Sequence, residues 1–337
     1  MPPEPSISVV IPTWNRADLL PETLDCVLAQ DNPAAEIIVV DDGSEDGTQA
    51  LLDRYKSRGV KNIRISNSGD LHARNVGLEA AKSTLVAFCD SDDLWKSTFL
   101  RMMVDCWNRE ARTCAVYADF QIVRDGVWET STKFDLAPTG FWDGLRPVSE
   151  GLFMFDRPMA DRLVSYQPFF PSALVANREF LLEIGGWDEG TSGLVGRDFA
   201  TAIRIAEHAP LGILRQPLVG IRKHTSNDSG DTLAMNLGDG KVLEHILRTR
   251  PAMAPYAAAI KASIIDRRRR ALDLAFTRGN FSLVRDIAEL LPPEAVSRLT
   301  QLKCLAARLP DPLRRISARG LMAAGTLKSR LQDSRSR

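Results

Sequence analysis

Three carboxylates, those of Asp90, Asp92 and Asp93, lie within one turn directly after the apolar run of residues 84–89. Like charges this close repel one another unless a cation lies between them. Carboxylate oxygens select Mg²⁺ or Mn²⁺ rather than zinc. The turn therefore predicts a divalent-cation site, and the simplest ligand to bind together with such an ion is a diphosphate. The alternative is a solvated turn in which Asp92 or Asp93 caps the helix that begins near Trp95.

A second pair of carboxylates, Asp41 and Asp42, follows the β-branched run of residues 36–40 and precedes Gly43. A carboxylate at such a point can accept hydrogen bonds from a nucleobase imide or from ribose hydroxyls. The glycine allows the backbone to approach a ligand closely. Taken alone, this segment is equally typical of an ordinary turn.

The elements that must position these residues alternate along the first half of the chain. Short β-branched runs occupy residues 7–11, 36–40, 62–66 and 84–89. The stretches between them have helical spacing, which favours parallel strands with helices on both faces of the sheet. Ligands bind such sheets at the carboxyl ends of the strands. We therefore expect the residues after these runs, including the segment 12–15, to meet at one edge.

The pattern changes beyond residue 117. The sequence predicts a hairpin over 119–128, a loop rich in Pro, Gly and aromatic residues up to 166, and then further strands and a helix. These later elements are a strand at 172–176, a helix at 178–184, a turn at 185–189, a helix from about Arg197, and strands at 211–214 and 218–223. Beyond 231 we expect helices separated by Pro251, Gly279–Asn280, Pro292–Pro293 and Pro310–Pro312.

The composition excludes a disordered or fibrous chain, because 44% of the 337 residues are hydrophobic. No run approaches the roughly 18 apolar residues that a membrane-spanning helix needs. Residues 1–6 lack the basic and apolar regions of an export signal. The five cysteines are scattered and never spaced as CxxC, so we predict neither a zinc site nor a disulfide framework. We expect a cytoplasmic globular protein.

Five segments, read together and in order, resemble one known family. They are SVVIPTWNRADLLPETLDCVLAQ (8–30), EIIVVDDGSEDGT (36–48), GDLHARNVGLEAAKSTLVAFCDSDDLW (69–95), SALVANREFLLEIGGWDE (172–189) and GRDFATAIRIA (196–206). The family is that of the inverting glycosyltransferases of family 2. The resemblance implies an α/β, Rossmann-like GT-A domain over residues 1–230, with a nucleotide half at about 5–120 and an acceptor half at about 121–230. The remaining residues, 231–337, would form a basic helical region.

The resemblance also implies site residues. The nucleotide pocket would be formed by Pro12, Thr13, Asn15, Asp41, Asp42, Arg74 and Asp92. Arg74 would reach toward the nucleotide or its phosphates, and a salt bridge on a helix surface is the alternative. Asp93 would be the main ligand of Mn²⁺ or Mg²⁺, with Asp92 close to it and to the ribose. His224 would contact the metal or the diphosphate, with Arg222 or Lys223 adding positive charge, although a histidine beside basic residues is as often simply exposed.

Inversion requires a base on the acceptor side, which the resemblance assigns to Asp198. The family usually has a Glu before this Asp, whereas this chain has Arg197. We expect Arg197 to favour the ionised form of Asp198 and to lower its basicity. The alternative is that Asp198 only caps its helix and pairs with Arg197. Trp187 is predicted either to offer a flat face to a sugar ring or to pack in the core.

The C-terminal region is basic, with 20 basic and 8 acidic residues over 241–337 in a chain of zero net charge. After Arg267–Arg270, the basic residues of the last forty positions include Arg298, Lys303, Arg308, Arg314, Arg315, Arg319, Lys328 and Arg330. Interleaved leucines make this end typical of a basic amphipathic helix. Such a helix would suit peripheral contact with the inner face of a membrane, where lipid-linked acceptors occur. The alternative is packing on the acidic domain or on a second copy in a homodimer. We expect no nucleic-acid partner.

These features predict a glycosyltransferase that moves a sugar from a nucleoside diphosphate donor, expected to be UDP-linked, to an acceptor hydroxyl with inversion. Its expected role is the synthesis of a cell-surface polysaccharide or glycoconjugate, with a glycan or lipid-linked acceptor. A non-catalytic scaffold or sensor that binds nucleotide sugars is the alternative, with Arg197 marking a lost base. A nucleotidyltransferase would require a Gly-rich basic loop after the first strand, and PTWNRADLL is not one.

Overall fold

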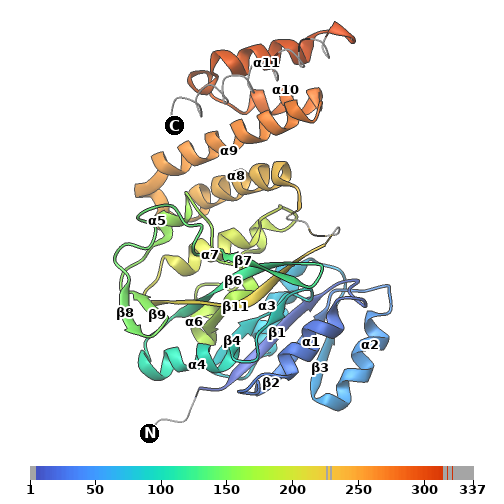
Figure 1. The fold of residues 1–337 in the computed structure, drawn as a ribbon, viewed down its shortest axis with the longest axis vertical. Helices are drawn as coiled ribbons and strands as arrows, with labels where there is room; N and C mark the ends of the chain where they lie inside the picture. Colours follow the sequence, from blue (N-terminus) through green and yellow to red (C-terminus); the bar gives the residue numbers. More distant parts are fainter. Residues whose placement is uncertain (1–4, 225–226, 228–229, 314–316, 318–320, 322–337) are drawn as a thin grey trace.

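The computed structural model describes residues 5–224, 227, 230–313, 317 and 321. Its centre is an 11-stranded sheet, whose main path runs in the order β3-β2-β1-β4-β10-β6-β11-β9-β8, with β5 and β7 off this path (Figure 1). The first four strands pair in parallel and are β1 (Ile7–Thr13), β2 (Glu36–Asp41), β3 (Val60–Arg64) and β4 (Leu85–Phe88). Helices α1 (Leu20–Leu28), α2 (Thr48–Tyr55) and α3 (Asp70–Ala80) alternate with them. The predicted alternation is confirmed over this half.

Both faces of this sheet are covered, which explains why β1 is buried along its whole length. Successive side chains of a strand point to opposite faces. Val9 packs in a core with Leu20 of α1 and Leu51 of α2. Val10 packs in a second core with Leu71 of α3. Strands between two helical layers must be apolar on both sides, so the unbroken apolar runs are the expected sequence signal.

The sheet is mixed rather than fully parallel. β10 (Leu174–Asn177) lies antiparallel between β4 and β6 (Ala115–Arg124). The chain enters β10 beside the carboxyl end of β4, where the Asp90 N–H donates to Ser172 Oγ at 2.9 Å, and therefore runs back along β4. Helix α6 (Arg178–Glu183) follows directly, with Asn177 as its cap. The other elements of this region are β5 (Leu94–Trp95), α4 (Phe99–Arg109) and α5 (Ala160–Leu163).

The predicted hairpin is present, as β6 pairs with β7 (Val127–Thr132). Asp125 and Gly126 at its turn both have positive φ, at 50° and 77°. The two strands predicted at 211–214 and 218–223 are one strand, β11 (Leu211–Lys223), whose pairing with β6 shifts register around Pro217. Proline cannot donate to the ladder, so it lies at an irregularity within a continuous strand. The segment predicted as loop contains β8 (Arg146–Ser149) and β9 (Leu152–Phe155), which extend the sheet beyond β11.

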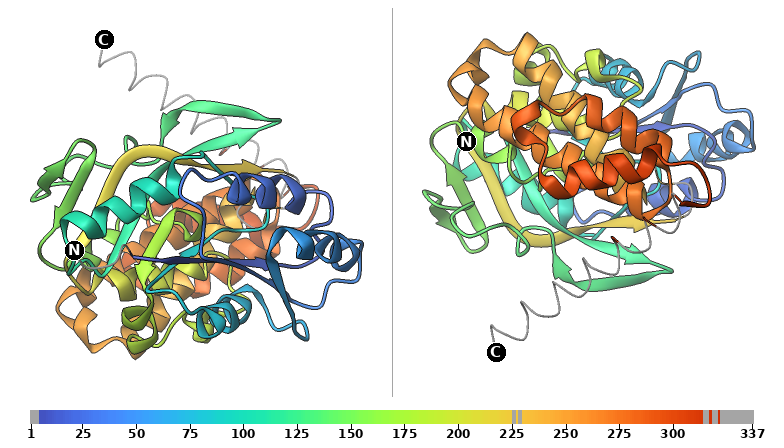
Figure 2. Two further views of the ribbon diagram at one scale, coloured as in Figure 1. Left: turned by 90° about the horizontal axis from the view of Figure 1, so that it is seen from below. Right: turned by 90° about the horizontal axis from the view of Figure 1, so that it is seen from above.

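The C-terminal helices stack on one another away from the sheet (Figures 1 and 2). They are α8 (Thr232–Thr249), α9 (Ala257–Thr277), α10 (Phe281–Glu289) and α11 (Arg298–Arg308). The predicted breaks at Pro251, Gly279–Asn280 and Pro292–Pro293 are confirmed, because each lies between two of these helices. α8 packs against α7 (Asp198–Ala206), and α9 packs on α8. No helix of the described residues is long and apolar enough to cross a membrane.

The apolar residues of α11 and of the segment after it, up to Leu313, are of two kinds, buried and exposed. Ala306 and Ala307 are buried against α10, which belongs to the C-terminal region itself, so this contact is not the predicted packing on the acidic domain. Exposed leucines form the other side and comprise Leu299, Leu302, Leu305, Leu309 and Leu313. The sequence-predicted basic residues Arg314, Arg315, Arg319, Lys328 and Arg330 lie outside the described residues.

Candidate functional site

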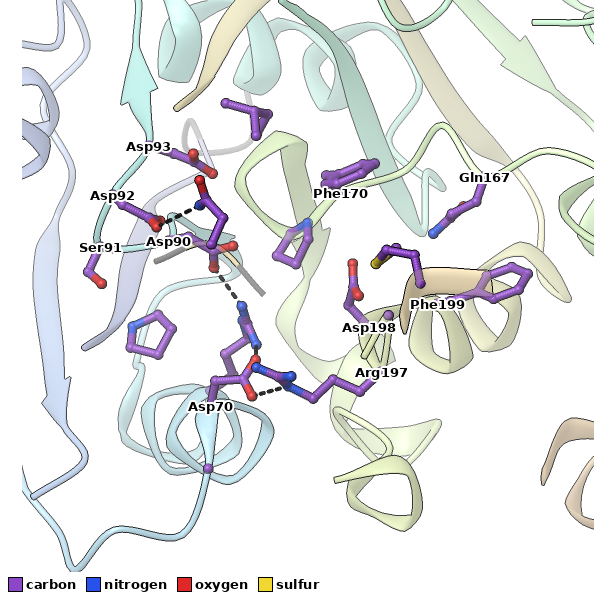
Figure 3. A pocket seen from close by; sticks show the side chains of 18 of the residues that line it. Asp70, Asp90, Ser91, Asp92, Asp93, Gln167, Phe170, Arg197, Asp198 and Phe199 are labelled. Atoms are coloured by element: carbon purple, nitrogen blue, oxygen red, sulfur yellow. Dashed lines mark hydrogen bonds and ion pairs between the residues drawn. The ribbon is translucent and has the colours of Figure 1, made fainter. Parts of the chain in front are cut away.

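A cavity of about 830 Å³ opens at the carboxyl edge of β1, β2 and β4. Figure 3 shows the acidic turn Asp90–Asp93 on one side and Asp198 on the other. The sequence-predicted residues that line the cavity are Pro12, Thr13, Asp42, Arg74, Asp92, Asp93 and Asp198. Residues distant in sequence thus meet where the parallel strands end. Asn15, Asp41 and His224 are not among its lining residues.

The acidic turn is held by Ser172, which precedes β10. The hydroxyl of Ser172 accepts from the Asp90 N–H and donates to Asp93 Oδ2 at 2.5 Å. The Arg222 N–H donates to Asp93 Oδ1 at 3.1 Å. Burial, together with the nearby charges of Asp92 and Asp90, raises the pKa of Asp93 well above its usual range. Asp93 is buried and Asp90 and Asp92 are half-buried, so the turn is a hydrogen-bonded cluster of carboxyl groups rather than a solvated cap.

Asp92 is the member of this turn that contacts His224. Its Oδ2 lies 2.8 Å from His224 Nε2, and Asn227 Nδ2 lies 3.5 Å from the same oxygen. His224 is half-buried rather than exposed. Within the part of the chain that the structure describes, no three His, Cys, Asp or Glu side chains are grouped as a metal site. The predicted loop after His224 includes residues 225–226 and 228–229, which lie outside the described ranges.

Arg74 is buried beneath the cavity, with only 5% of its side chain exposed. Its Nη2 donates to Asp90 Oδ1 at 2.5 Å, and its Nη1 donates to Asp70. The alternative of a surface salt bridge is therefore wrong. The guanidinium stacks 4.9 Å from the ring centre of Trp187, whose other contact is an edge-to-face pair with Phe88. Trp187 is buried and does not line the cavity, so the core-packing alternative holds for it.

Asp70 is a site residue that the sequence reasoning missed. It accepts from Arg74 and also from Arg197 Nε, 127 residues further along the chain. Its spacing of four residues from Arg74 on one helix is the only local signal of this role. The bond to Arg197 has no local signal, because α3 and the start of α7 meet only in the folded chain. Arg197 also donates to the Leu194 carbonyl at 3.2 Å.

Asp198 begins α7, and its N-cap Arg197 makes no side-chain capping bond. Among the described residues, no hydrogen bond or ion pair engages the Asp198 carboxylate. Burial raises the pKa of Asp198 to about 6, against opposing effects of Arg74 and Arg197. Arg197 acts on the pKa of Asp198 in the expected direction, but burial outweighs it, so the net effect is a raised pKa.

The predicted nucleotide residues divide into two groups. Asp42 lines the cavity, and its two oxygens accept from the Ser68 and Gly69 N–H groups at 2.7 and 2.8 Å. Asp41 is fully buried, and its Oδ1 accepts from the Ser44 N–H at 2.9 Å. Asn15 accepts from the Glu45 N–H at 2.8 Å. Asp41 and Asn15 thus shape the loops beside the cavity without lining it.

The far wall of the cavity comes from parts of the chain that sequence reasoning did not assign to the site. They contribute Lys133, Tyr166, Gln167, Met235, Asp239, Arg267 and Arg270. Arg267 and Arg270 belong to the arginine run of α9, whose basic character was the only sequence signal. Close packing brings α8 to the wall, because a Cβ on Gly238 would overlap the carbonyl oxygen of Val195.

Comparisons with known proteins agree with this geometry. Residues 8–163 match the family model described as Glycosyl transferase family 2. The putative teichuronic acid biosynthesis glycosyltransferase TuaG of Bacillus subtilis (strain 168) is 39% identical over 116 residues, which cover 33% of this chain and 45% of that protein. The matched segments span less than half of the length of the first curated relatives.

Two solved structures share the fold of nearly the whole chain. The crystal structure of S. aureus TarS 1-349 in complex with UDP-GlcNAc has a TM-score of 0.60 and 17% identity, covering 96% of this chain and 92% of that one. The mannosyltransferase PcManGT from Pyrobaculum calidifontis, in complex with GDP-Man and Mn²⁺, has a TM-score of 0.53 and 21% identity, with coverage of 96% and 86%. The predicted GT-A fold is confirmed, and the predicted resemblance to glycosyltransferase family 2 is confirmed by the family match of residues 8–163.

Proposed function

We propose that this protein transfers a sugar from a UDP-linked donor to an acceptor hydroxyl with inversion, in the synthesis of a cell-surface polysaccharide or glycoconjugate. The observation that carries this proposal is the carboxylate of Asp198, which has no hydrogen-bond or ion-pair partner among the described residues and faces the acidic turn across one cavity. The family match of residues 8–163 supports a sugar-transfer reaction. The UDP-GlcNAc bound to TarS and the role of TuaG in teichuronic acid biosynthesis support the donor and the pathway class.

The donor would lie on the side of β1, β2 and β4. Asp42 and the backbone of Pro12 and Thr13 line this side and offer acceptors for a base and a ribose. Arg74 holds Asp90 in place and keeps a positive charge beneath the acidic turn. The uridine end of the donor would therefore bind near Asp42, and the diphosphate would extend toward Asp92.

The acidic turn fits a divalent cation. Asp92 and His224 contact each other, and the pKa of the buried Asp93 beside them is raised by burial and then by neighbouring like charges, whose repulsion a cation would relieve. Mg²⁺ is commonly bound through one or two carboxylates together with substrate phosphates. We assign Asp92, Asp93 and His224 to Mn²⁺ or Mg²⁺. When bound, the ion would neutralise negative charge on the diphosphate.

Asp198 would act as the base. The acceptor oxygen forms a bond to the anomeric carbon, the bond from that carbon to the diphosphate breaks, and the acceptor proton passes to Asp198. A carboxyl with a pKa of about 6 is mostly ionised at neutral pH, yet it is a stronger base than an ordinary Asp. The bond between Arg197 and Asp70 leaves the Asp198 carboxylate open toward the cavity.

The test measures sugar transfer or donor hydrolysis together with UDP binding. Asp198→Asn should lower turnover by about 10²- to 10⁴-fold and leave the UDP dissociation constant unchanged. Asp92→Asn should weaken metal-dependent UDP binding. The exposed Asp161 of α5 lies outside the cavity and provides the control Asp161→Asn. Binding of UDP-sugars without any hydrolysis or transfer by the wild type would instead support a scaffold or sensor.

We also place the enzyme at an anionic membrane surface through α11. Its exposed leucines, including Leu302 and Leu305, would enter the interface, and the excess of basic residues beyond 240 would attract acidic lipids. The protein should float with vesicles that contain phosphatidylglycerol. Leu302→Glu combined with Leu305→Glu should abolish flotation, whereas Leu136→Glu, at an exposed site elsewhere, should not. Homodimerisation without vesicle binding would contradict this assignment.

A further inference from the structure

Charge is divided between the two sides of the cavity. The donor side carries the carboxylates of the acidic turn and Asp42. The far wall carries Lys133 from the loop after β7, together with Arg267 and Arg270 from α9. Among the described lining residues, Asp239 is the one carboxylate that the C-terminal helices contribute. The side remote from the donor therefore has an excess of positive charge.

Within the described residues, Lys133 is near the carboxylate of Asp239 but is not paired with it. It forms no ion pair with a carboxylate of any described residue, and its ammonium lies 4.7 Å from the ring centre of Tyr166. Burial lowers the pKa of Lys133, and the nearby charge of Lys223 lowers it further. A partly buried ammonium in this state is stabilised when an anion binds beside it. The Tyr166 hydroxyl donates to the Lys133 carbonyl at 2.7 Å and so holds the loop in place.

The basic wall is close to the proposed base. Arg267 is paired with Asp239, and its guanidinium lies 5.8 Å from the ring centre of Phe199, the residue after Asp198. A Cβ on Gly196 would overlap Asp239 Oδ1, so α8 contacts the segment that leads into α7. Arg270 is exposed and pairs with Asp266 at 2.7 Å, a surface pair that an acidic ligand can replace at little cost.

The donor diphosphate is a poor candidate for this wall. Lys223 lies near Asp92 and Asp93 and lines the cavity on the diphosphate side, where Arg16 also lies, 3.9 Å from Asp92 Oδ2. Arg267 lies instead beside Phe199, on the side of Asp198. We propose that the acceptor is an acidic glycan, and that Lys133, Arg267 and Arg270 bind a phosphate or carboxylate on it while Asp198 faces the reacting hydroxyl. This proposal rests on the transferase function stated above.

The test compares charged and neutral probes on the full-length protein saturated with UDP and Mn²⁺. Trigalacturonic acid is compared with its methyl ester, and glucose 6-phosphate with glucose, by calorimetry at low and at high salt. The wild type should bind at least one charged probe about tenfold more tightly than its neutral partner, and salt should reduce the difference. The pair that shows the preference identifies carboxylate or phosphate as the recognised group.

Lys133→Met and Arg270→Gln should each remove most of this preference and leave the UDP dissociation constant unchanged. The matched control is Lys261→Met, an exposed lysine of α9 outside the cavity. Equal binding of charged and neutral probes, or a preference that both variants retain, would overturn the proposal. Weakened UDP binding in the variants would assign the wall to the donor and also overturn it. Absence of UDP binding in the wild type would count against the proposed function itself.

Discussion

Two carboxylates of the cavity, the buried Asp93 and the half-buried Asp198, differ in what surrounds their oxygens. Asp93 accepts from the Ser172 hydroxyl and the Arg222 N–H, which fix its orientation. Asp198 has no such bond among the described residues. A group that orients an ion needs a fixed geometry, whereas a base needs lone pairs that are open to the substrate. Their surroundings therefore favour the separate roles that we propose.

The pH dependence of turnover follows from Asp198. Because burial raises its pKa to about 6, the base form is lost as the pH falls through 6. We expect kcat/KM for sugar transfer to rise with pH and to level off above about pH 7. Steady-state rates between acid and neutral pH measure this rise of kcat/KM. A rise centred near pH 4, typical of an ordinary Asp, would contradict the assignment.

The same burial affects stability. The pKa of Asp198 is about 6 in the folded state and about 3.9 when unfolded. Between these values the folded state binds more protons, so the free energy of unfolding falls as the pH rises from about 4 to 6. Asp198→Asn should raise the free energy of unfolding by about 1 to 3 kcal/mol at neutral pH and change it little near pH 4. Urea denaturation at both pH values checks this, and a loss of stability at neutral pH would count against it.

At the scale of elements, the contact between α8 and the segment before α7 positions the far wall. Gly238 is the point of closest approach, because an added Cβ would overlap the Val195 carbonyl. Gly240, on the same helix, has open space in the direction of a Cβ. The two glycines of one helix therefore separate the effect of the contact from that of helix propensity.

Gly238→Ala should lower the free energy of unfolding by about 1 to 3 kcal/mol and reduce turnover, because α8 must move away from the segment that carries Asp198. Gly240→Ala should raise it by up to about 1 kcal/mol, because alanine favours the helix. Thermal unfolding and donor hydrolysis measure both effects. Equal behaviour of the two variants would show that the close contact is unimportant.

At the scale of the whole molecule, the acidic and basic parts of the chain pack together. Contacts across this boundary include the ion pair of Arg250 with Glu207 and the hydrogen bond that the Ser263 hydroxyl donates to the Val164 carbonyl at 2.8 Å. The cavity draws its lining from both parts. A ligand that fills it contacts both the sheet and the C-terminal helices, so its binding should stabilise them as one unit.

UDP together with Mn²⁺ should therefore raise the melting temperature in a single transition. At a ligand concentration 100 times Kd, the gain is about 2.7 kcal/mol. Chelation of the metal should remove most of the gain, and Asp92→Asn should reduce it. Differential scanning calorimetry measures the shift. A shift that is unaffected by chelation would contradict the metal assignment.

The sequence by itself determined the alternation of the first half, the edge of the sheet at which the site lies, and the family. It could do so because strand length, apolar runs and turn residues are local, and parallel strands must end at one edge. The tertiary structure alone decided the antiparallel position of β10, the bridge from Asp70 to Arg197, and the far wall from α8 and α9. These features depend on contacts between residues distant in sequence. The net basicity of Asp198 was also decided by the tertiary structure, since burial is a property of the packed molecule and outweighs the expected effect of Arg197.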